Sequence, residues 1–288
     1  MQLIDGKAIA ERIKNDIAET VKKRKAKGYK IPHLATILVG SDPASQTYVN
    51  SKIKNCAKVG FNSTLIELPE STSEEQLLYE IDLLNNNEDI DGFIVQLPLP
   101  GHIDEHNIIM AIDPKKDVDG FHPMNVGKMT LDIPSLLPAT PYGILELLKA
   151  YKIETGGKKV LVLGRSHIVG RPISILLSQK RSEGNATVTL AHSCSRNIEQ
   201  LTKEADIIIA AVGQPEMITG DMVKDGVVII DVGIHRIDDS TKKKGYRLAG
   251  DVDFESVAPK ASYITPVPGG VGSLTIAMLL KNTLLACE

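Results

Sequence analysis

The stretch "VLVLGRSHIVGRP", residues Val160 to Pro172, decides the fold of the second half of the chain. An apolar run leads into a turn framed by Gly164 and Gly170, and a helical pattern follows directly. Dinucleotide-binding folds use this order of strand, turn and helix, because free N–H groups at the start of the helix bind pyrophosphate. Ser166 replaces the second glycine of the motif G-x-G-x-x-G. A tight turn that serves only packing therefore remains the alternative for this segment.

The same rhythm continues along the second half. Short runs rich in Val and Ile are separated by connections long enough for helices. These runs span residues 158–164, 186–192, 205–213, 226–233 and 262–267. Strands that alternate with helices pair in parallel through right-handed crossovers. The second half is therefore predicted to be a Rossmann-like dinucleotide-binding domain.

The first half alternates in a similar way. An amphipathic helix is predicted at residues 6–28, and strands are predicted at residues 33–40, 63–69 and 91–101. The helix before the last of these strands starts with a capping box, Ser73-x-x-Gln76. A region rich in Pro, Gly and Asp, residues 113–141, separates the two halves. The predicted fold class is α/β, with two α/β domains flanking a cleft, where ligands usually bind.

Composition and charge exclude several classes of protein. With 42% hydrophobic and 24% charged residues, the 288-residue chain has the composition of a globular protein. The net charge of -3, with no basic run interleaved with aromatic residues, gives no reason to expect a nucleic-acid partner. No apolar stretch reaches the roughly 20 residues that span a bilayer. We expect a cytoplasmic protein without a membrane partner, because the amino terminus lacks a signal-peptide pattern and the three cysteines lie far apart.

The strand predicted at residues 186–192 bears on the choice of cofactor. An NAD enzyme usually places Asp or Glu at the end of this strand, to hold the ribose 2'-hydroxyl. This chain has His192, Ser193, Ser195 and Arg196 there, and Arg165 lies in the preceding turn. That set favours a 2'-phosphate and so NADP rather than NAD, although Arg and Ser also occur at strand ends without a function.

Polar residues follow the strands predicted in the first half, where open α/β sheets bind ligands. They are Tyr48 with Lys52, Gln96, and Asp117 with Asp119. Gln96 ends an apolar run, so we expect its amide at the edge of the sheet, either for a ligand or as a local backbone cap. Tyr48 and Lys52 lie one helical turn apart beside the apolar stripe. The alternative for this pair is a partly buried tyrosine with a solvated lysine.

The segment "HIDEH", His102 to His106, matches a zinc-peptidase pattern in which both histidines lie within a helix. Here it follows Pro98-Leu99-Pro100-Gly101, so it is predicted to begin a helix. No third ligand source is evident downstream, and we expect no metal site.

Eight motifs in order along the chain carry a resemblance to a known family. They are "DPASQTYVNSKIKNCAKVG", "VQLPLP", "DVDGFHP", "PATPYG", "GRSHIVGRP", "DVGI", "GDVDF" and "TPVPGGVGSLTIAMLL". Together they resemble the methylenetetrahydrofolate dehydrogenase/cyclohydrolase family. The resemblance implies NADP-dependent oxidation of 5,10-methylenetetrahydrofolate to the methenyl form, followed by hydrolysis to 10-formyltetrahydrofolate. It also implies a homodimer of two-domain subunits. Residues 1–138 plus 272–288 would form the folate-binding catalytic domain, and residues 139–271 the NADP-binding domain.

The resemblance also implies roles for individual residues. Lys52 matches the catalytic lysine, Tyr48 lines the folate site, Gln96 partners the lysine, and Asp119 holds the pterin. The remaining implied substrate residues are Leu97, Pro268, Gly269 and Gly270. The implied cofactor residues are Gly164, Arg165, Ser166, Ser193 and Ile234.

The departures from the family pattern are local. Ala139 stands where Cys is common, and Ser273-Leu274 stands where Pro-Met is usual. The connection "LSQKRSEGNATV" is longer than in the shortest members, as it also is in NAD-using mitochondrial members. Two other functions remain open at this stage: an NADP oxidoreductase of the shikimate dehydrogenase kind, and a non-catalytic folate- or nucleotide-binding regulator.

Overall fold

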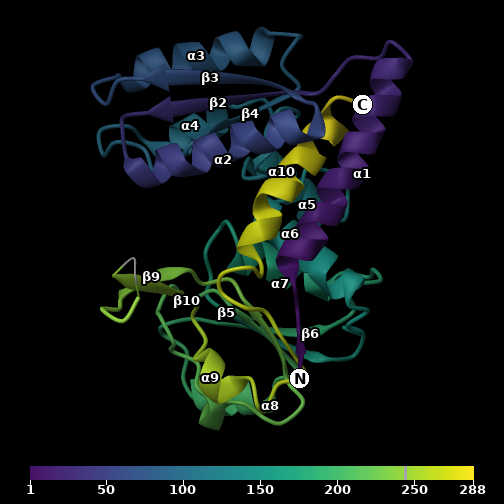
Figure 1. Cartoon of the computed structure of the whole chain (residues 1–288), viewed down its shortest axis with the longest axis vertical. Coiled ribbons are helices and arrows are strands. Elements are labelled where there is room, and N and C mark those ends of the chain that lie inside the picture. The colour runs from purple at the N-terminus through teal and green to yellow at the C-terminus, as the bar shows by residue number, and fades with distance from the viewer. Residues whose placement is uncertain (243–244) are drawn as a thin grey trace. The chain divides into compact units, whose positions relative to one another are not determined.

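The computed structural model describes residues 1–242 and 245–288, and these residues form two compact units (Figure 1). The first comprises Glu11–Ala139 and Ile276–Glu288, and the second comprises Met1–Ala10 and Thr140–Thr275. We call them the three-stranded unit and the six-stranded unit, after their main sheets. The domain bounds expected from the sequence, residues 1–138 plus 272–288 and residues 139–271, differ from these units at Met1–Ala10, at Ala139 and at residues 272–275.

The three-stranded unit is built on a parallel sheet of order β3-β2-β4. Its strands are β2 (His33–Val39), β3 (Asn62–Leu68) and β4 (Gly92–Val95). The helices that lie wholly or partly in it are α1 (Gly6–Ala26), α2 (Pro43–Val59), α3 (Glu74–Asn86), α4 (Glu105–Ala111), α5 (Pro123–Thr130) and α10 (Gly272–Ala286). The predicted strands and the helices between them are confirmed.

Helices cover both faces of this sheet, which explains why every residue of β2 after His33 is buried. Figure 1 shows α2 and α3 on opposite sides of the strands. On one face, Ala35, Ile37 and Val39 pack against residues of α3 and α4 such as Ile81 and Ile108. The capping box at the start of α3 is confirmed, since the Ser73 and Gln76 side chains exchange hydrogen bonds with backbone amides. The last helix, α10, lies beside α1 in Figure 1, and the Arg24 guanidinium donates to the Cys287 carbonyl.

The six-stranded unit has a parallel sheet of order β1-β11-β8-β7-β5-β6. Its strands are β1 (Gln2–Leu3), β5 (Lys159–Leu163), β6 (Thr187–Ala191), β7 (Ile207–Ala210), β8 (Val228–Asp231) and β11 (Tyr263–Ile264). The helices are α6 (Ala139–Ala150), α7 (Gly170–Ser178), α8 (Ile198–Glu204), the 3-10 turn η1 (Gly220–Met222) and α9 (Phe254–Val257). All five strands predicted for this half are confirmed, and the unit is Rossmann-like as expected.

Two features of this unit were not predicted. The strand β1 pairs with β11, which takes the amino terminus into the larger sheet. A separate antiparallel hairpin is formed by β9 (His235–Asp238) and β10 (Tyr246–Ala249). All three strands are only two to four residues long, which is too short for a clear periodic signal, and β1 in addition pairs with residues far away in sequence. None of the helices in residues 1–242 and 245–288 combines the length and the apolar character needed to cross a bilayer.

Candidate active site

Lys52 lies in the middle of α2, whose two ends are fixed by local interactions. The Asp42 side chain accepts a hydrogen bond from the Ser45 amide at the start of the helix, and Pro43 occupies the first turn. Gly60, in the left-handed conformation, ends it. Val49 and Cys56 face the core, each 1% exposed, and Lys52 is half-buried between them. The helix thus holds an ammonium group close to apolar side chains.

Gln96 follows β4 directly, as the sequence predicted, and its amide is oriented by two backbone contacts. The Gln96 backbone N–H donates to the Ile37 carbonyl at 2.9 Å, which prolongs the pairing of β4 with β2. The side-chain Nε2 donates to the Leu97 carbonyl at 2.6 Å. The side-chain Oε1 then accepts a hydrogen bond of 3.0 Å from the Lys52 Nζ. The Gln96 side chain therefore caps the local backbone through its nitrogen and contacts Lys52 through its oxygen.

The charge of Lys52 is unfavourable in this position. Burial lowers the pKa of Lys52, and the neighbouring charge of Asp119 and the Cys56 thiol oppose that shift. Burial also raises the pKa of the Cys56 thiol to about 12, so Cys56 is a neutral neighbour at physiological pH. A lysine whose ammonium form is disfavoured can accept a proton nearer neutral pH than a solvated lysine can.

Asp117 and Asp119 lie in one loop but differ in their surroundings. Asp117 is 3% exposed, and its carboxylate accepts hydrogen bonds from the amides of Gly120 and His122 and from the Asn125 side chain. These bonds, at 3.1, 2.8 and 2.9 Å, close the turn. Asp117 therefore serves the structure of the turn, and before the structure only the family resemblance separated it from Asp119.

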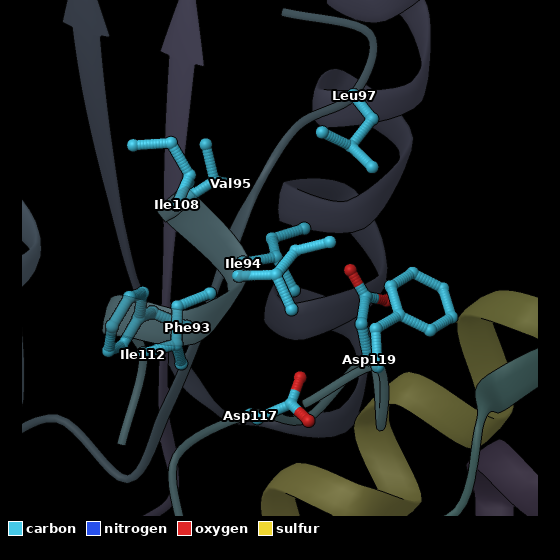
Figure 2. Close-up of a pocket in the computed structure, with 10 residues that line it drawn as sticks. Phe93, Ile94, Val95, Leu97, Ile108, Ile112, Asp117 and Asp119 are labelled. Carbon is cyan, nitrogen blue, oxygen red and sulfur yellow. The ribbon is translucent and has the colours of Figure 1, made fainter. Parts of the chain in front are cut away.

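The Asp119 carboxylate, in contrast, accepts no hydrogen bond within residues 1–242 and 245–288. It lines a pocket together with Leu97, Phe121 and apolar residues of β4 such as Ile94, as Figure 2 shows. Burial raises the pKa of Asp119, the charge of Lys52 opposes that shift, and Asp117 adds to it. An unpaired carboxylate at an apolar wall can bind a ligand that offers N–H donors.

Tyr48 is on the same helix as Lys52 but makes no hydrogen bond to the other expected site residues that the structure describes. It lies one turn before Lys52, with 52% of its surface exposed. Among the described residues, no hydrogen bond joins Tyr48 to Lys52, Gln96 or Asp119. The structure thus brings together Lys52, Gln96, Leu97 and Asp119, and it leaves the Tyr48 ring accessible for a ligand.

The other expected substrate residues, Pro268 to Gly270, lie in the six-stranded unit. This loop packs on the amino terminus of the chain. The Lys7 amide donates to the Gly269 carbonyl at 3.0 Å, and a Cβ at Gly6 would collide with the Gly270 carbonyl.

The turn after β5 has the features needed to approach a phosphate closely. Gly164 has φ +107°, and a Cβ there would collide with the Ala211 carbonyl. A Cβ at Gly170, the first residue of α7, would collide with the Gly164 carbonyl. Ser166 accepts hydrogen bonds from the amides of Val169 and Gly170 through its hydroxyl, at 3.2 and 3.3 Å. The serine that replaces a glycine of the motif therefore orders the start of the helix.

The remaining expected cofactor residues follow the carboxyl ends of three strands of the parallel sheet in this unit. Arg165 follows β5, Ser193 follows β6, and Ile234 follows β8. All three side chains are exposed, Ile234 by 53%. An exposed isoleucine at the same edge of the sheet as the phosphate turn offers an apolar surface to a bound ring.

A buried network of acids beside Ile234 was missed in the sequence. Asp251, 0% exposed, binds the His235 ring at 2.7 Å through one oxygen and accepts from the amides of Val212 and Gly213 through the other. Asp231 accepts from the amides of Gly233, Asp251 and Val252. Burial raises the pKa of Asp231 to about 6, against these amide hydrogen bonds. The available signal was the close spacing of Asp and Gly in "DVGI" and "GDVDF", since a Cβ at Gly250 would collide with the Asp231 carboxylate.

Comparisons with known proteins cover the whole chain. The family model described as "Tetrahydrofolate dehydrogenase/cyclohydrolase, catalytic domain" matches residues 4–119, and that of the family's "NAD(P)-binding domain" matches residues 138–288. The bifunctional protein FolD of Flavobacterium psychrophilum is 62% identical over 288 residues, which are 100% of this chain and 98% of that protein. The FolD of Bacteroides thetaiotaomicron is 57% identical over 99% of this chain and 98% of its own length.

Solved structures agree with these relatives. The bifunctional enzyme FolD, a methylenetetrahydrofolate dehydrogenase/cyclohydrolase from Campylobacter jejuni, has a TM-score of 0.93 and 46% identity, covering 100% of this chain and 98% of that one. The FolD of Trypanosoma brucei, in complex with NADP cofactor and an inhibitor, has a TM-score of 0.91 and 42% identity, covering 99% and 96%.

Proposed function

The chain belongs to the tetrahydrofolate dehydrogenase/cyclohydrolase family, and from that premise we propose how its residues divide the two reactions. It is a bifunctional enzyme that oxidises 5,10-methylenetetrahydrofolate with NADP and hydrolyses the methenyl product to 10-formyltetrahydrofolate. Neither a hydroxy-acid dehydrogenase nor a non-catalytic regulator remains as an alternative. The proposal concerns the roles of individual residues, the domains that carry them and the assembly.

Lys52 is the general base of the hydrolysis step in this proposal. The methenyl substrate is a delocalised cation, and water must lose a proton as it attacks the bridging carbon. A carboxylate at this point would stabilise the cation and so oppose the attack, whereas a neutral amine accepts a proton without doing so. The observation that carries the assignment is the half-buried Lys52 ammonium, with its lowered pKa and its hydrogen bond to the Gln96 Oε1. Gln96 and Tyr48 position this lysine and the substrate.

Asp119 holds the pterin ring. A pterin presents an amino group and an adjacent ring N–H, and one carboxylate can accept both hydrogen bonds. The carboxylate of Asp119 is without a hydrogen bond within residues 1–242 and 245–288, and Leu97 beside it supplies an apolar wall for the ring.

The cofactor residues fit NADP in their chemistry. The turn from Gly164 to Gly170 excludes side chains where a pyrophosphate would approach, and no acid ends β6 beside Ser193. Arg165 and Ser193 would hold the 2'-phosphate, with Ser166 at the pyrophosphate and Ile234 against the nicotinamide end. NADP supplies the hydride acceptor of the first step, and the task of these residues is to align it. We assign folate binding to the three-stranded unit, with the Pro268–Gly270 loop as a further border, and NADP binding to the six-stranded unit.

Replacing Lys52 by Met tests the base. We expect hydrolysis to fall by at least about 100-fold, since general-base catalysis contributes about 10²–10⁴-fold. The dissociation constants for folate and NADP should change by less than about threefold. The absorbance of the methenyl form during turnover separates oxidation from hydrolysis. Repeating the measurement with NAD in place of NADP gives the cofactor preference. Lys54→Met, on the exposed side of α2, is the matched control. Hydrolysis at the parental rate by Lys52→Met would remove lysine from the mechanism.

We also propose that the enzyme is a homodimer in the cytoplasm. We expect no nucleic-acid or membrane partner. The family resemblance supports the dimer, and the free thiols of Cys56, Cys194 and Cys287 support a reducing compartment. Light scattering on the purified chain should give twice the mass of 31.2 kDa, and a single-chain mass at working concentrations would refute the dimer.

A further inference from the structure

Asn282 is a buried polar residue in an apolar part of α10. Ala277, Met278, Leu279 and Leu280 precede it, and each is at most 2% exposed. Asn282 itself is 0% exposed. Its Nδ2 donates two hydrogen bonds of 2.8 Å, to the carbonyls of Val118 and Leu137. Val118 is the residue directly before Asp119, so the last helix holds the loop that carries the proposed pterin ligand.

The two segments joined by Asn282 also contact each other. Gly120 has φ +75°, and a Cβ there would lie 2.5 Å from the backbone of Leu137 and Pro138. Asn282 therefore links two backbone segments, around Val118 and around Leu137, that are already in contact. Without its amide, two carbonyls in this packed region would lose a donor, and buried carbonyls rarely stay unpaired.

These contacts hold the backbone on both sides of Asp119, while its carboxylate accepts no hydrogen bond from the described residues. Asn282 fixes the residue before it, and Asp117 closes the turn after it through the Gly120 and His122 amides. Figure 2 shows α10, in yellow, beside the loop that carries both aspartates. The Asn282 Oδ1 has no hydrogen-bond partner among the described residues, so donation is the polar role of this side chain.

We propose that Asn282 is a positioning residue for the folate reactions, which sets the direction of the Asp119 carboxylate through the backbone of Val118. The inference rests on the proposed role of Asp119 in binding the pterin. It places a specificity element for folate in α10, far in sequence from Lys52, Gln96 and Asp119.

Asn282→Leu tests the inference, with Thr283→Val as the matched control. Both residues are 0% exposed in the same helix, but among the described residues the Thr283 hydroxyl bonds only within that helix, to the Leu279 carbonyl. We expect Asn282→Leu to raise the folate KM and the folate dissociation constant about tenfold, with the NADP dissociation constant changed less than about twofold. Thr283→Val should leave both within about twofold. A weakening of folate and NADP binding alike, or an equal effect of the two variants, would show a structural role only.

A double-mutant cycle with Asp119→Asn shows whether Asn282 acts through Asp119. If it does, Asn282→Leu adds less than about twofold to the folate dissociation constant of Asp119→Asn. Additive effects would overturn the inference. Parental folate binding by Asp119→Asn would instead overturn the proposed role of Asp119. Should the Leu variant not fold, Asn282→Ser, which keeps a shorter donor, replaces it in the same measurements with the same criteria.

Discussion

At the scale of the residue, the site depends on how each polar group is satisfied. Asp117 and Asp119 are two positions apart in the sequence, yet Asp117 accepts three hydrogen bonds and Asp119 lines a pocket with its carboxylate unbonded among the described residues. Gln96 uses its amide nitrogen on its own backbone, which leaves its oxygen for Lys52. Asp117 therefore stabilises the turn, and Asp119 is the aspartate that we propose for the ligand.

The lowered pKa of Lys52 predicts a conflict between activity and stability. In the folded protein the pKa lies below 10.5, so the unfolded chain binds more protons between the two pKa values, and stability rises with pH in that window. Near neutral pH the buried lysine therefore costs stability. We expect Lys52→Met to be more stable than the parent at about pH 7, by about 1 kcal/mol in the free energy of unfolding, and so to unfold at a higher temperature. This difference should shrink toward about pH 10. Thermal melts across this range check it, and a destabilised variant at every pH would contradict the burial argument.

At the scale of the element, two turns show why glycine is needed. The turn between β5 and α7 brings Gly164 against the Ala211 carbonyl, and the amide groups that Ser166 orders come directly after it. The loop of Asp119 brings Gly120 against Leu137 in the same manner. In both cases the backbone of one element touches that of another, at the place where a ligand is proposed to bind.

Gly164→Ala should weaken NADP binding by at least about tenfold while folate binding changes less than about twofold. The cause is the collision with the Ala211 carbonyl, added to a positive φ that alanine disfavours. Gly157→Ala is the matched control, because Gly157 has φ +70° in the same unit and nothing within 4 Å of the added Cβ. It should lose about 1 kcal/mol of stability and keep its affinity for NADP. Equal losses of NADP affinity in both variants would refute the role of the turn.

At the scale of the whole molecule, each compact unit contains segments that are distant in sequence. The six-stranded unit takes its edge strand from the amino terminus, and the three-stranded unit takes Ile276–Glu288 from the carboxyl terminus. The second of these segments supplies fully buried residues such as Leu280, as well as the Asn282 amide. Neither unit is therefore complete as one continuous stretch of chain.

A chain ended after Thr275 should lose folate binding and retain NADP binding. The deletion removes Ile276–Glu288 from the three-stranded unit, whereas the six-stranded unit ends at Thr275. Calorimetric titration with tetrahydrofolate and with NADP measures both affinities, and melting with each ligand shows which one still stabilises the protein. A truncated chain with unchanged folate affinity would contradict the contribution of the last helix to this unit.

The sequence by itself determined the order of strands and helices, the parallel pairing, the phosphate turn and the family. Each of these follows from local periodicity or from short motifs such as "GRSHIVGRP" and "DVDGFHP", which neighbouring residues specify. Only the tertiary structure decided the edge strand β1, the division of labour between Asp117 and Asp119, the support from Asn282 and the lowered pKa of Lys52. The physical reason is that burial and hydrogen-bond partners depend on residues that are distant in sequence, 164 positions apart in the case of Asn282 and Val118. Such contacts leave no pattern in a single sequence.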